Sequence, residues 1–168
     1  MTPIYRPAAP ADASDMAEML NRIIQAGGTT AHQSLFDADR MLDHYIAPPL
    51  AISCHVALLG EAIIGFQALE RADPDWQGEG KLPDGWAVIA TFVGEGHRGL
   101  GVGRRLFALT LAAARAATVV AIDATIRADN QLGLAYYSKM GFADRAIIED
   151  VPLRDGTKID RVQKVFRL

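Results

Sequence analysis

The segment of this sequence with the clearest chemical potential is a run of glycines at residues 94–103, Gly-Glu-Gly-His-Arg-Gly-Leu-Gly-Val-Gly. Glycines allow positive backbone φ angles and a close approach of the main chain to a ligand. The free N–H groups at the start of a helix attract anions, and the helix dipole strengthens that field. Because Arg98 and the glycines stand between an apolar stretch and a helix-favouring stretch, we predict a loop that holds a phosphate-bearing ligand.

Two common kinds of phosphate-binding loop fit this segment poorly. A P-loop requires Lys and then Ser or Thr after its last glycine, but Gly101 is followed by Val102 and Gly103, which excludes nucleoside triphosphatase chemistry. A dinucleotide fingerprint matches residues 94–99, with Asp123 as the ribose-binding acid. That register buries two glycines inside a helix at about 1 kcal/mol each. Too few residues follow Asp123 to complete a dinucleotide sheet, so this alternative is the weaker one.

A second group of polar and aromatic residues lies at 130–142, Asn-Gln-Leu-Gly-Leu-Ala-Tyr-Tyr-Ser-Lys-Met-Gly-Phe. Asn130 is of a type that caps helices. Tyr136 and Tyr137 are consecutive on the helix that we predict here, so their side chains project about 100° apart. We therefore expect one of them to face a ligand and the other to face the core or solvent; from spacing alone, both could be core aromatics.

Hydrophobic spacing and turn residues predict the elements that position these groups. The predicted strands cover 4–6, 51–59, 61–69, 86–93, 118–126, 142–148 and 159–168. The predicted helices start near Asp12 or Ser14 and end at Gly27, and then cover 37–45, 103–117 and 130–140. The order is typical of an α/β domain, with a right-handed crossover joining a parallel pair at 86–93 and 118–126. The polar stretch at 71–85 is predicted to be an exposed loop, either a lid or a pocket wall.

Composition and charge narrow the class of protein. The 168 residues suit one domain, 1–168, and no apolar run is long enough for a membrane span. The net charge of −3 disfavours nucleic-acid and membrane partners, although residues 96–115 carry +4 and the remainder −7. Cys54 is the only cysteine, which excludes an internal disulfide and a cysteine-based zinc site. With no basic and apolar leader at 1–20, we expect a cytoplasmic protein.

Taken together, the two motifs resemble those of the GNAT (GCN5-related) N-acetyltransferases. Residues 98–103 follow the family's pyrophosphate-loop pattern Arg/Gln-x-x-Gly-x-Gly/Ala, and residues 130–142 follow its pattern Asn-(x)6-Tyr-(x)3-Gly-Phe. The resemblance implies the GNAT fold, a central mixed twisted β-sheet of about six to seven strands flanked by about four helices. It also implies transfer of an acetyl group from acetyl-CoA to a primary amine by direct attack in a ternary complex, with no metal. Cys54 is accordingly interpreted as core packing rather than as a nucleophile.

The resemblance assigns roles residue by residue. Tyr137 falls on the position of the general acid, which protonates the departing thiolate, and Tyr136 is the neighbour most easily confused with it. The main chain at Thr91 and Val93 would meet the acetyl and pantetheine part, with the Val93 N–H as a candidate oxyanion donor, and Asn130 would contact the pantetheine arm. The residues predicted to bind the cofactor are Thr91, Val93, Arg98, Gly99, Gly101, Val102, Gly103, Arg104 and Asn130.

The general base and the acceptor are less well defined. Many relatives place a glutamate on the central strand, but residues 86–93 contain no carboxylate. A water relay could end on one of four acids, Glu70, Glu79, Asp84 and Glu95, whereas His97 suits the cofactor rim. The loop at 27–32 is expected to border the acceptor. The predicted pocket wall includes Phe36, Trp76 and Trp86.

The expected acceptor is an amino acid or an amino-acid-like amine, because the chain looks closest to the phosphinothricin and L-amino acid N-acyltransferase branch. A homodimer is possible, since relatives often dimerise. Three alternatives remain open: a peptide or protein N-acetyltransferase, a non-catalytic CoA-binding module, and a nicotinamide-dependent oxidoreductase.

Overall fold

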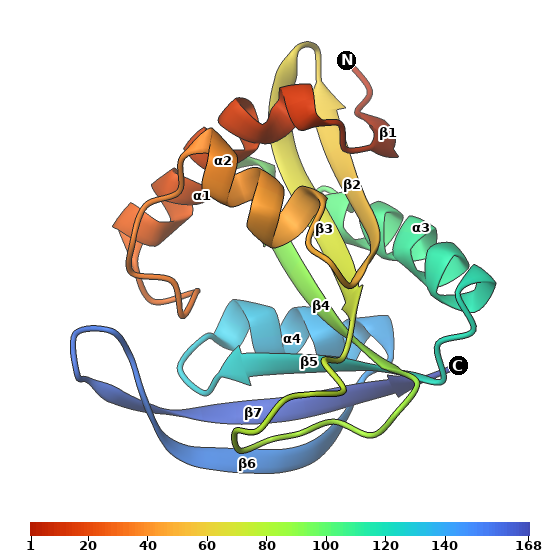
Figure 1. Cartoon of the computed structure of the whole chain (residues 1–168). Helices are drawn as coiled ribbons and strands as arrows, with labels where there is room; N and C mark the ends of the chain where they lie inside the picture. The colour runs from red at the N-terminus through yellow and green to blue at the C-terminus, as the bar shows by residue number, and fades with distance from the viewer.

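A seven-stranded mixed sheet in the order β1-β2-β3-β4-β5-β7-β6 runs through the computed structural model, which describes residues 1–168 (Figure 1). Its strands are β1 (Ile4–Pro7), β2 (Ala51–Leu59), β3 (Ala62–Arg71), β4 (Trp86–Val93), β5 (Ala121–Arg127), β6 (Ala143–Pro152) and β7 (Lys158–Arg167). All neighbouring strands are antiparallel except β4 and β5. The observed order of strands and helices is the predicted one, and a single parallel pair does not make a dinucleotide-binding sheet.

Helices cover both faces of the sheet. The first two, α1 (Ala13–Ala26) and α2 (Ala38–Met41), pack on one face, and α2 continues as a π-helical turn at Leu42–Ile46. The other two, α3 (Val102–Ala116) and α4 (Gln131–Met140), pack on the opposite face. Helix α1 ends at Gly27, whose φ of 74° suits glycine. Asp12 precedes α1 as predicted, but its carboxylate pairs with Arg6 instead of capping the helix.

The alternation of side chains along β4 decides which residues lie on which face. Ala90 and Phe92 pack with Phe66 in the core beneath α1 and α2. Ile89 packs with Ile122 in the core beneath α3 and α4. Odd-numbered positions of β4 therefore face α3 and α4, and even-numbered positions face α1 and α2.

The parallel strands β4 and β5 are paired over only part of their length. Their register covers three residue pairs, which run from Trp86 with Ala121 to Val88 with Asp123. Beyond Val88, β4 remains paired with β3 as far as Val93, while β5 diverges from it. The carboxyl-terminal half of β4 thus presents one unpaired edge, and a gap opens in the sheet at that point.

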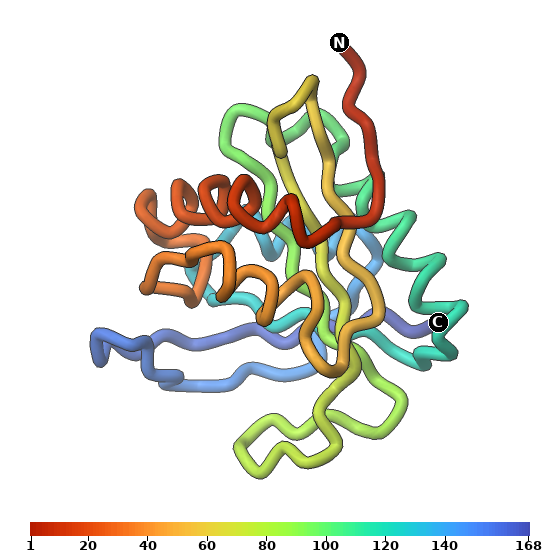
Figure 2. Tube along the Cα trace, turned by 45° about the horizontal axis from the view of Figure 1, so that its top comes forward, coloured from red at the N-terminus to blue at the C-terminus, as the bar shows by residue number.

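The polar connection between β3 and β4 lies at the opposite end of the sheet from the glycine segment (Figure 2). It leaves β3 after Arg71 and returns at Trp86, the start of β4, whereas the glycine segment follows Val93 at the end of β4. The polar connection between β3 and β4 therefore lies far from the gap between β4 and β5.

Candidate active site

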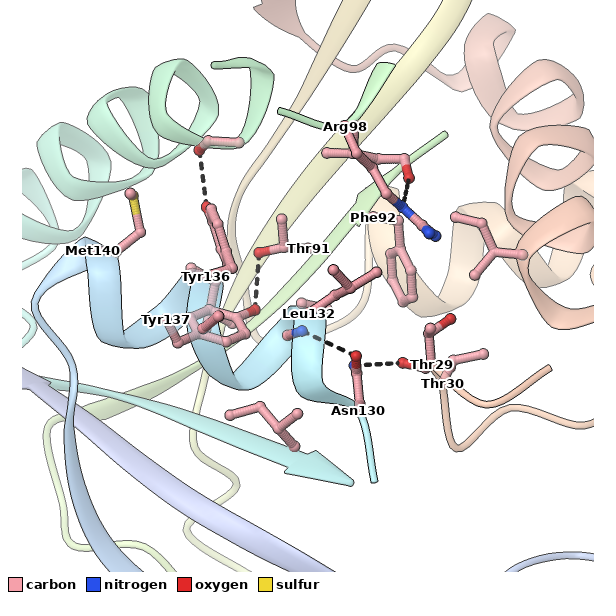
Figure 3. A pocket seen from close by; sticks show the side chains of 18 of the residues that line it. Thr29, Thr30, Thr91, Phe92, Arg98, Asn130, Leu132, Tyr136, Tyr137 and Met140 are labelled. Carbon is pink, nitrogen blue, oxygen red and sulfur yellow. Dashed lines mark hydrogen bonds between the residues drawn. The ribbon is translucent and has the colours of Figure 1, made fainter. Parts of the chain in front are cut away.

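A cavity of about 820 Å³ occupies the gap between β4 and β5, and its walls come from both faces of the sheet (Figure 3). Its wall on one face includes the glycine segment and α4, and its wall on the other face includes the loop that follows α1. Ten residues were predicted from the sequence to bind the cofactor or to act in catalysis, and all ten line this cavity: Thr91, Val93, Arg98, Gly99, Gly101, Val102, Gly103, Arg104, Asn130 and Tyr137.

The free edge of β4 directs main-chain groups into the cavity. Gly94 N donates to Ile64 O at 2.9 Å and Ala72 N donates to Trp86 O at 3.0 Å, so even-numbered residues of β4 bond to β3. In an antiparallel pair the intervening residues point their N–H and C=O groups the other way. The main chain at Thr91 and Val93 therefore faces the gap, where it is available to a ligand.

The glycine segment ends in an uncapped helix start. Gly99 and Gly101 have φ angles of 77° and 80°, and no side chain caps the first N–H groups of α3. These N–H groups lack partners within the helix and lie at the cavity wall with Arg98 and Arg104. An added Cβ at Gly101 would meet no atom within 4 Å, so the space beside this loop is open. Main-chain donors, two guanidinium groups and open space fit the pyrophosphate of a coenzyme A molecule.

Gly103 is held against Tyr136 from the neighbouring helix. An added Cβ at Gly103 would lie 2.6 Å from Cε2 of Tyr136, which leaves no room for a side chain there. The hydroxyl of Tyr136 donates a hydrogen bond to Gly103 O at 2.8 Å. Tyr136 therefore fixes the start of α3 relative to α4, and glycine is required at position 103 for this contact.

A buried glutamine connects both tyrosines. Gln67 on β3 is completely buried, and its Nε2 donates to the Tyr136 hydroxyl at 3.1 Å and to Thr91 Oγ1 at 2.8 Å. The single hydroxyl proton of Tyr136 is already given to a carbonyl, so Tyr136 can only accept from Gln67. This requirement fixes the amide of Gln67 with its Nε2 toward the hydroxyls.

The relay continues from Thr91 to Tyr137, whose hydroxyl lies 2.8 Å from Thr91 Oγ1. Because Thr91 Oγ1 already accepts from Gln67, its own proton is available to Tyr137. When Thr91 is the donor in this pair, the phenolic proton of Tyr137 is left for a ligand. Burial raises the pKa of Tyr137 above its ordinary value, which keeps the phenol protonated. Burial likewise raises the pKa of Tyr136 to about 12.

Asn130 has two structural contacts. Its Oδ1 accepts from Gly133 N at 2.9 Å and caps α4, and its Nδ2 donates to Thr29 O at 2.9 Å (Figure 3). The cap that we considered from the sequence is therefore present, and the same amide fastens the loop that follows α1.

On the α1 and α2 face, the cavity ends among aromatic and cationic groups. His32 Nε2 lies 2.6 Å from the Tyr45 hydroxyl, and both rings pack near Phe92. Burial and the nearby charges of His44 and Arg40 lower the pKa of His32 to about 4, so its ring is neutral. Arg127 donates to Thr30 O at 2.9 Å, which places this guanidinium on the same face.

The charges along the cavity wall are of one sign. Five permanent cations line it: Arg98, Arg104, Arg127, Lys139 and Arg161. No aspartate or glutamate lines it, so none of the acids at positions 70, 79, 84 and 95 would contact a bound ligand directly. The suggestion that Phe36, Trp76, Trp86 and the 71–85 loop form the pocket wall is wrong, because none of them reaches the cavity.

Two functional features were not predicted from the sequence. Gln67 is the one polar residue in the apolar stretch 62–69, and that interruption was a usable signal. Arg127 and Arg161 gave no signal, because only the pairing of β5 with β7 brings them together. Cys54 is buried outside the cavity, and burial raises the pKa of its thiol to about 12, which confirms its interpretation as a core residue.

The structure has neither a metal-binding cluster nor a membrane-spanning helix. No group of three or more His, Cys, Asp or Glu side chains is arranged to hold a metal ion. None of the helices has the length and apolar character that crossing a membrane requires.

Comparisons with known proteins point to one family. The family model of the acetyltransferase (GNAT) family matches residues 16–142. No curated protein matches the sequence. Many solved structures match, and three examples show how similar their folds are.

The ribosomal-protein-alanine N-acetyltransferase from Brucella melitensis has a TM-score of 0.78 at 21% identity over 98% of this chain and 99% of that one. A protein assigned as a phosphinothricin N-acetyltransferase has a TM-score of 0.79 at 19% identity, over 99% of each chain. The yncA protein of Salmonella typhimurium was solved with its cofactor acetyl-CoA. It has a TM-score of 0.77 at 19% identity, over 100% of this chain and 95% of that one. Identities this low show a shared fold.

Proposed function

This chain belongs to the acetyltransferase (GNAT) family, and from that premise we propose that it transfers the acetyl group of acetyl-CoA to the primary amine of a small molecule. The observation that carries the proposal is one continuous cavity whose lining residues come from both faces of the sheet. One face offers phosphate-binding groups and the other offers an aromatic and cationic pocket. Donor and acceptor can therefore be held at once, which supports direct transfer in a ternary complex.

On the donor side, the protein binds with its main chain and positions the reacting carbonyl. The uncapped start of α3 and the two arginines would hold the pyrophosphate, and the free edge of β4 would hold the pantetheine arm. Acetyl-CoA supplies an acetyl group activated as a thioester. The Val93 N–H, which points into the gap, would donate to the carbonyl oxygen as negative charge develops there.

Tyr137 acts as the general acid in this proposal. With Thr91 as the donor in their shared hydrogen bond, the phenolic proton of Tyr137 is left for the substrate, and the bond orients the hydroxyl. The raised pKa keeps that proton in place until a sulfur anion begins to form beside it. Cys54 cannot act as a nucleophile, because it lies outside the cavity as a protonated thiol.

The cavity itself promotes loss of the amine proton. No carboxylate lines its wall, and Arg161 at the acceptor end has no acid partner, so a bound ammonium group is disfavoured relative to the neutral amine. The pKa of the bound acceptor is therefore lower than in water, and its proton can leave to solvent. In this proposal no side chain of the wall needs to act as a carboxylate base.

The acceptor end favours a small molecule over a protein. The loop after α1 is tied down by bonds from Arg127 to Thr30 O and from Asn130 to Thr29 O. The turn between β6 and β7 adds a bond from Asp155 N to the side chain of Gln33, at 2.9 Å. A loop held in this way restricts the space at the acceptor end, so we favour an amino acid or an amino-acid-like amine, as in the phosphinothricin-type branch.

The proposal is tested by incubating the protein with acetyl-CoA and a panel of amines and by measuring the release of free thiol. The panel holds amino acids, amino acid amides, polyamines, aminoglycosides and a peptide. Release with a small amine and none with the peptide is the expected result. CoA that binds without turnover for any amine would overturn the proposal and favour a non-catalytic module. A thermal-shift comparison of CoA with NAD serves as a control for the ligand class.

A further inference from the structure

One partly buried guanidinium in the cavity, that of Arg161, has no partner in the protein. Arg161 on β7 lines the cavity and is partly buried, yet its side chain makes no hydrogen bond and no ion pair in the protein. Arginine remains charged at any pH that the protein meets, and a partly buried charge without a counter-ion is unfavourable. The unpaired charge of Arg161 therefore calls for an anion.

The neighbouring arginine provides a comparison. Arg127 is the cross-strand partner of Arg161, so both side chains lie on the same face of the sheet. Arg127 is neutralised by Asp129, which it contacts through two hydrogen bonds of 2.9 and 2.8 Å. Arg161 has the like charge of Arg127 beside it and no acid of its own; burial and this repulsion lower its pKa. Of the two arginines, only Arg161 thus lacks a counter-ion in the protein.

The face on which Arg161 lies decides which ligand it can meet. Ile126 packs in the core beneath α3 and α4, so Arg127 and its partner Arg161 point to the opposite face, toward α1 and α2. The glycine segment, α3 and α4 stand on the other side of the sheet. The phosphates of the donor are therefore out of reach, and the anion for Arg161 belongs to the acceptor.

We infer that Arg161 binds a carboxylate of the acceptor, so that the substrate is a primary amine that carries a carboxylate close to it, such as a free amino acid. The inference rests on the proposed function and adds to it the chemical class of the substrate. A guanidinium binds a carboxylate through two parallel hydrogen bonds, which gives orientation as well as affinity. The anion also offsets the unfavourable positive charge of the cavity. An amino acid amide, a polyamine or the N-terminus of a peptide has no carboxylate beside its amine.

The test compares amino acids with their primary amides in the full-length protein and in Arg161→Gln. The wild-type protein is expected to acetylate the best amino acid with a kcat/KM at least tenfold above that of its amide. Arg161→Gln should lower kcat/KM for the amino acid about 10- to 100-fold, mainly through KM, and leave the value for the amide within about twofold. Arg161→Lys, which keeps the charge and loses the paired bonds, should fall between the two.

Arg22→Gln is the matched control, because Arg22 is an exposed arginine without partners outside the cavity. The affinity of Arg161→Gln for CoA, measured by calorimetry, should equal that of the wild type. An equal loss for acid and amide, or a wild-type preference for amides, polyamines or peptides, overturns the carboxylate assignment and leaves the acetyltransferase proposal standing. The proposed function itself fails if the wild type acetylates no small-molecule amine.

Discussion

Thr91 Oγ1 and the hydroxyl of Tyr137 lie 2.8 Å apart, although the two residues are separated by 46 positions in the chain. The contact joins the free half of β4 to α4 across the wall of the cavity. Gln67 donates a hydrogen bond from its Nε2 to the same Thr91 Oγ1. The orientation of the predicted acid is therefore set by two residues, neither of which needs to touch the sulfur.

We expect Tyr137→Phe to lower kcat about 100- to 1,000-fold, because the substitution removes the only phenolic proton free for the leaving thiolate. The KM for acetyl-CoA should change little. Tyr136→Phe is the matched control: it removes the bonds with Gly103 and Gln67 and should cost about 1 kcal/mol of stability with only a few-fold change in kcat. Steady-state thiol release and thermal melts measure both. A larger loss of kcat in Tyr136→Phe would exchange the roles of the two tyrosines.

Thr91→Val should lower kcat about tenfold and leave one N–H of Gln67 buried without a partner, at a cost of about 1–3 kcal/mol. Thr91→Ser keeps the hydroxyl and should remain within about threefold of the wild type. Measuring the reaction rate and the denaturant midpoint of both variants distinguishes the effect of losing the hydroxyl from the effect of losing the methyl group. If serine were as damaging as valine, Thr91 would matter for packing and the relay would be unsupported.

Gly101→Ala should weaken the binding of CoA about tenfold or more, because alanine is strained at a φ of 80° and would displace the N–H groups at the start of α3. Gly103→Ala should weaken it as well, since the new Cβ would push Tyr136 away. Gly96→Ala is the control, because Gly96 has no positive φ and no atom near an added Cβ. Calorimetric titration with CoA measures all three, and equal affinities would show that the loop does not hold the cofactor.

Stability should fall as the pH drops from 6.5 to about 4. The unfolded chain protonates His32 below its ordinary pKa of 6.5, whereas the folded protein does so only below about 4. Within that window the unfolded state binds the extra proton, so the free energy of unfolding decreases as the pH falls, and the loss is complete below 4. The expected size is about 1–3 kcal/mol. Urea unfolding at several pH values should show this slope in the wild type and a smaller one in His32→Gln.

The pH profile of kcat at saturating substrates should rise with pH and show no descending limb below about pH 10. The rise reports loss of the amine proton, and its midpoint should lie below the pKa of the same amine in water because the cavity wall is cationic. The descending limb is absent because burial raises the pKa of Tyr137 above its ordinary value. A bell-shaped profile with a limb near pH 8 would contradict the assignment of Tyr137 as the acid.

The sequence predicted the order of all the elements, because glycines, prolines and apolar spacing mark each boundary locally. It also predicted the residues of the cavity near Gly101 and Tyr137, which lie in contiguous motifs. The acceptor end was not predictable in the same way. Arg161 meets Arg127 only through the pairing of β7 with β5, and the direction of a loop such as 71–85 depends on where its strands end. Side chains that come together through long-range pairing leave no local pattern to detect.

The gap between β4 and β5 also bears on how products depart. If donor and acceptor occupy opposite faces of the sheet, free CoA and the acetylated amine leave by separate routes, and neither blocks the exit of the other. Free CoA should then compete with acetyl-CoA for its own half of the cavity and should not compete with the amine. The divergence of two strands after Val88 would in this way set the product-inhibition pattern of the enzyme.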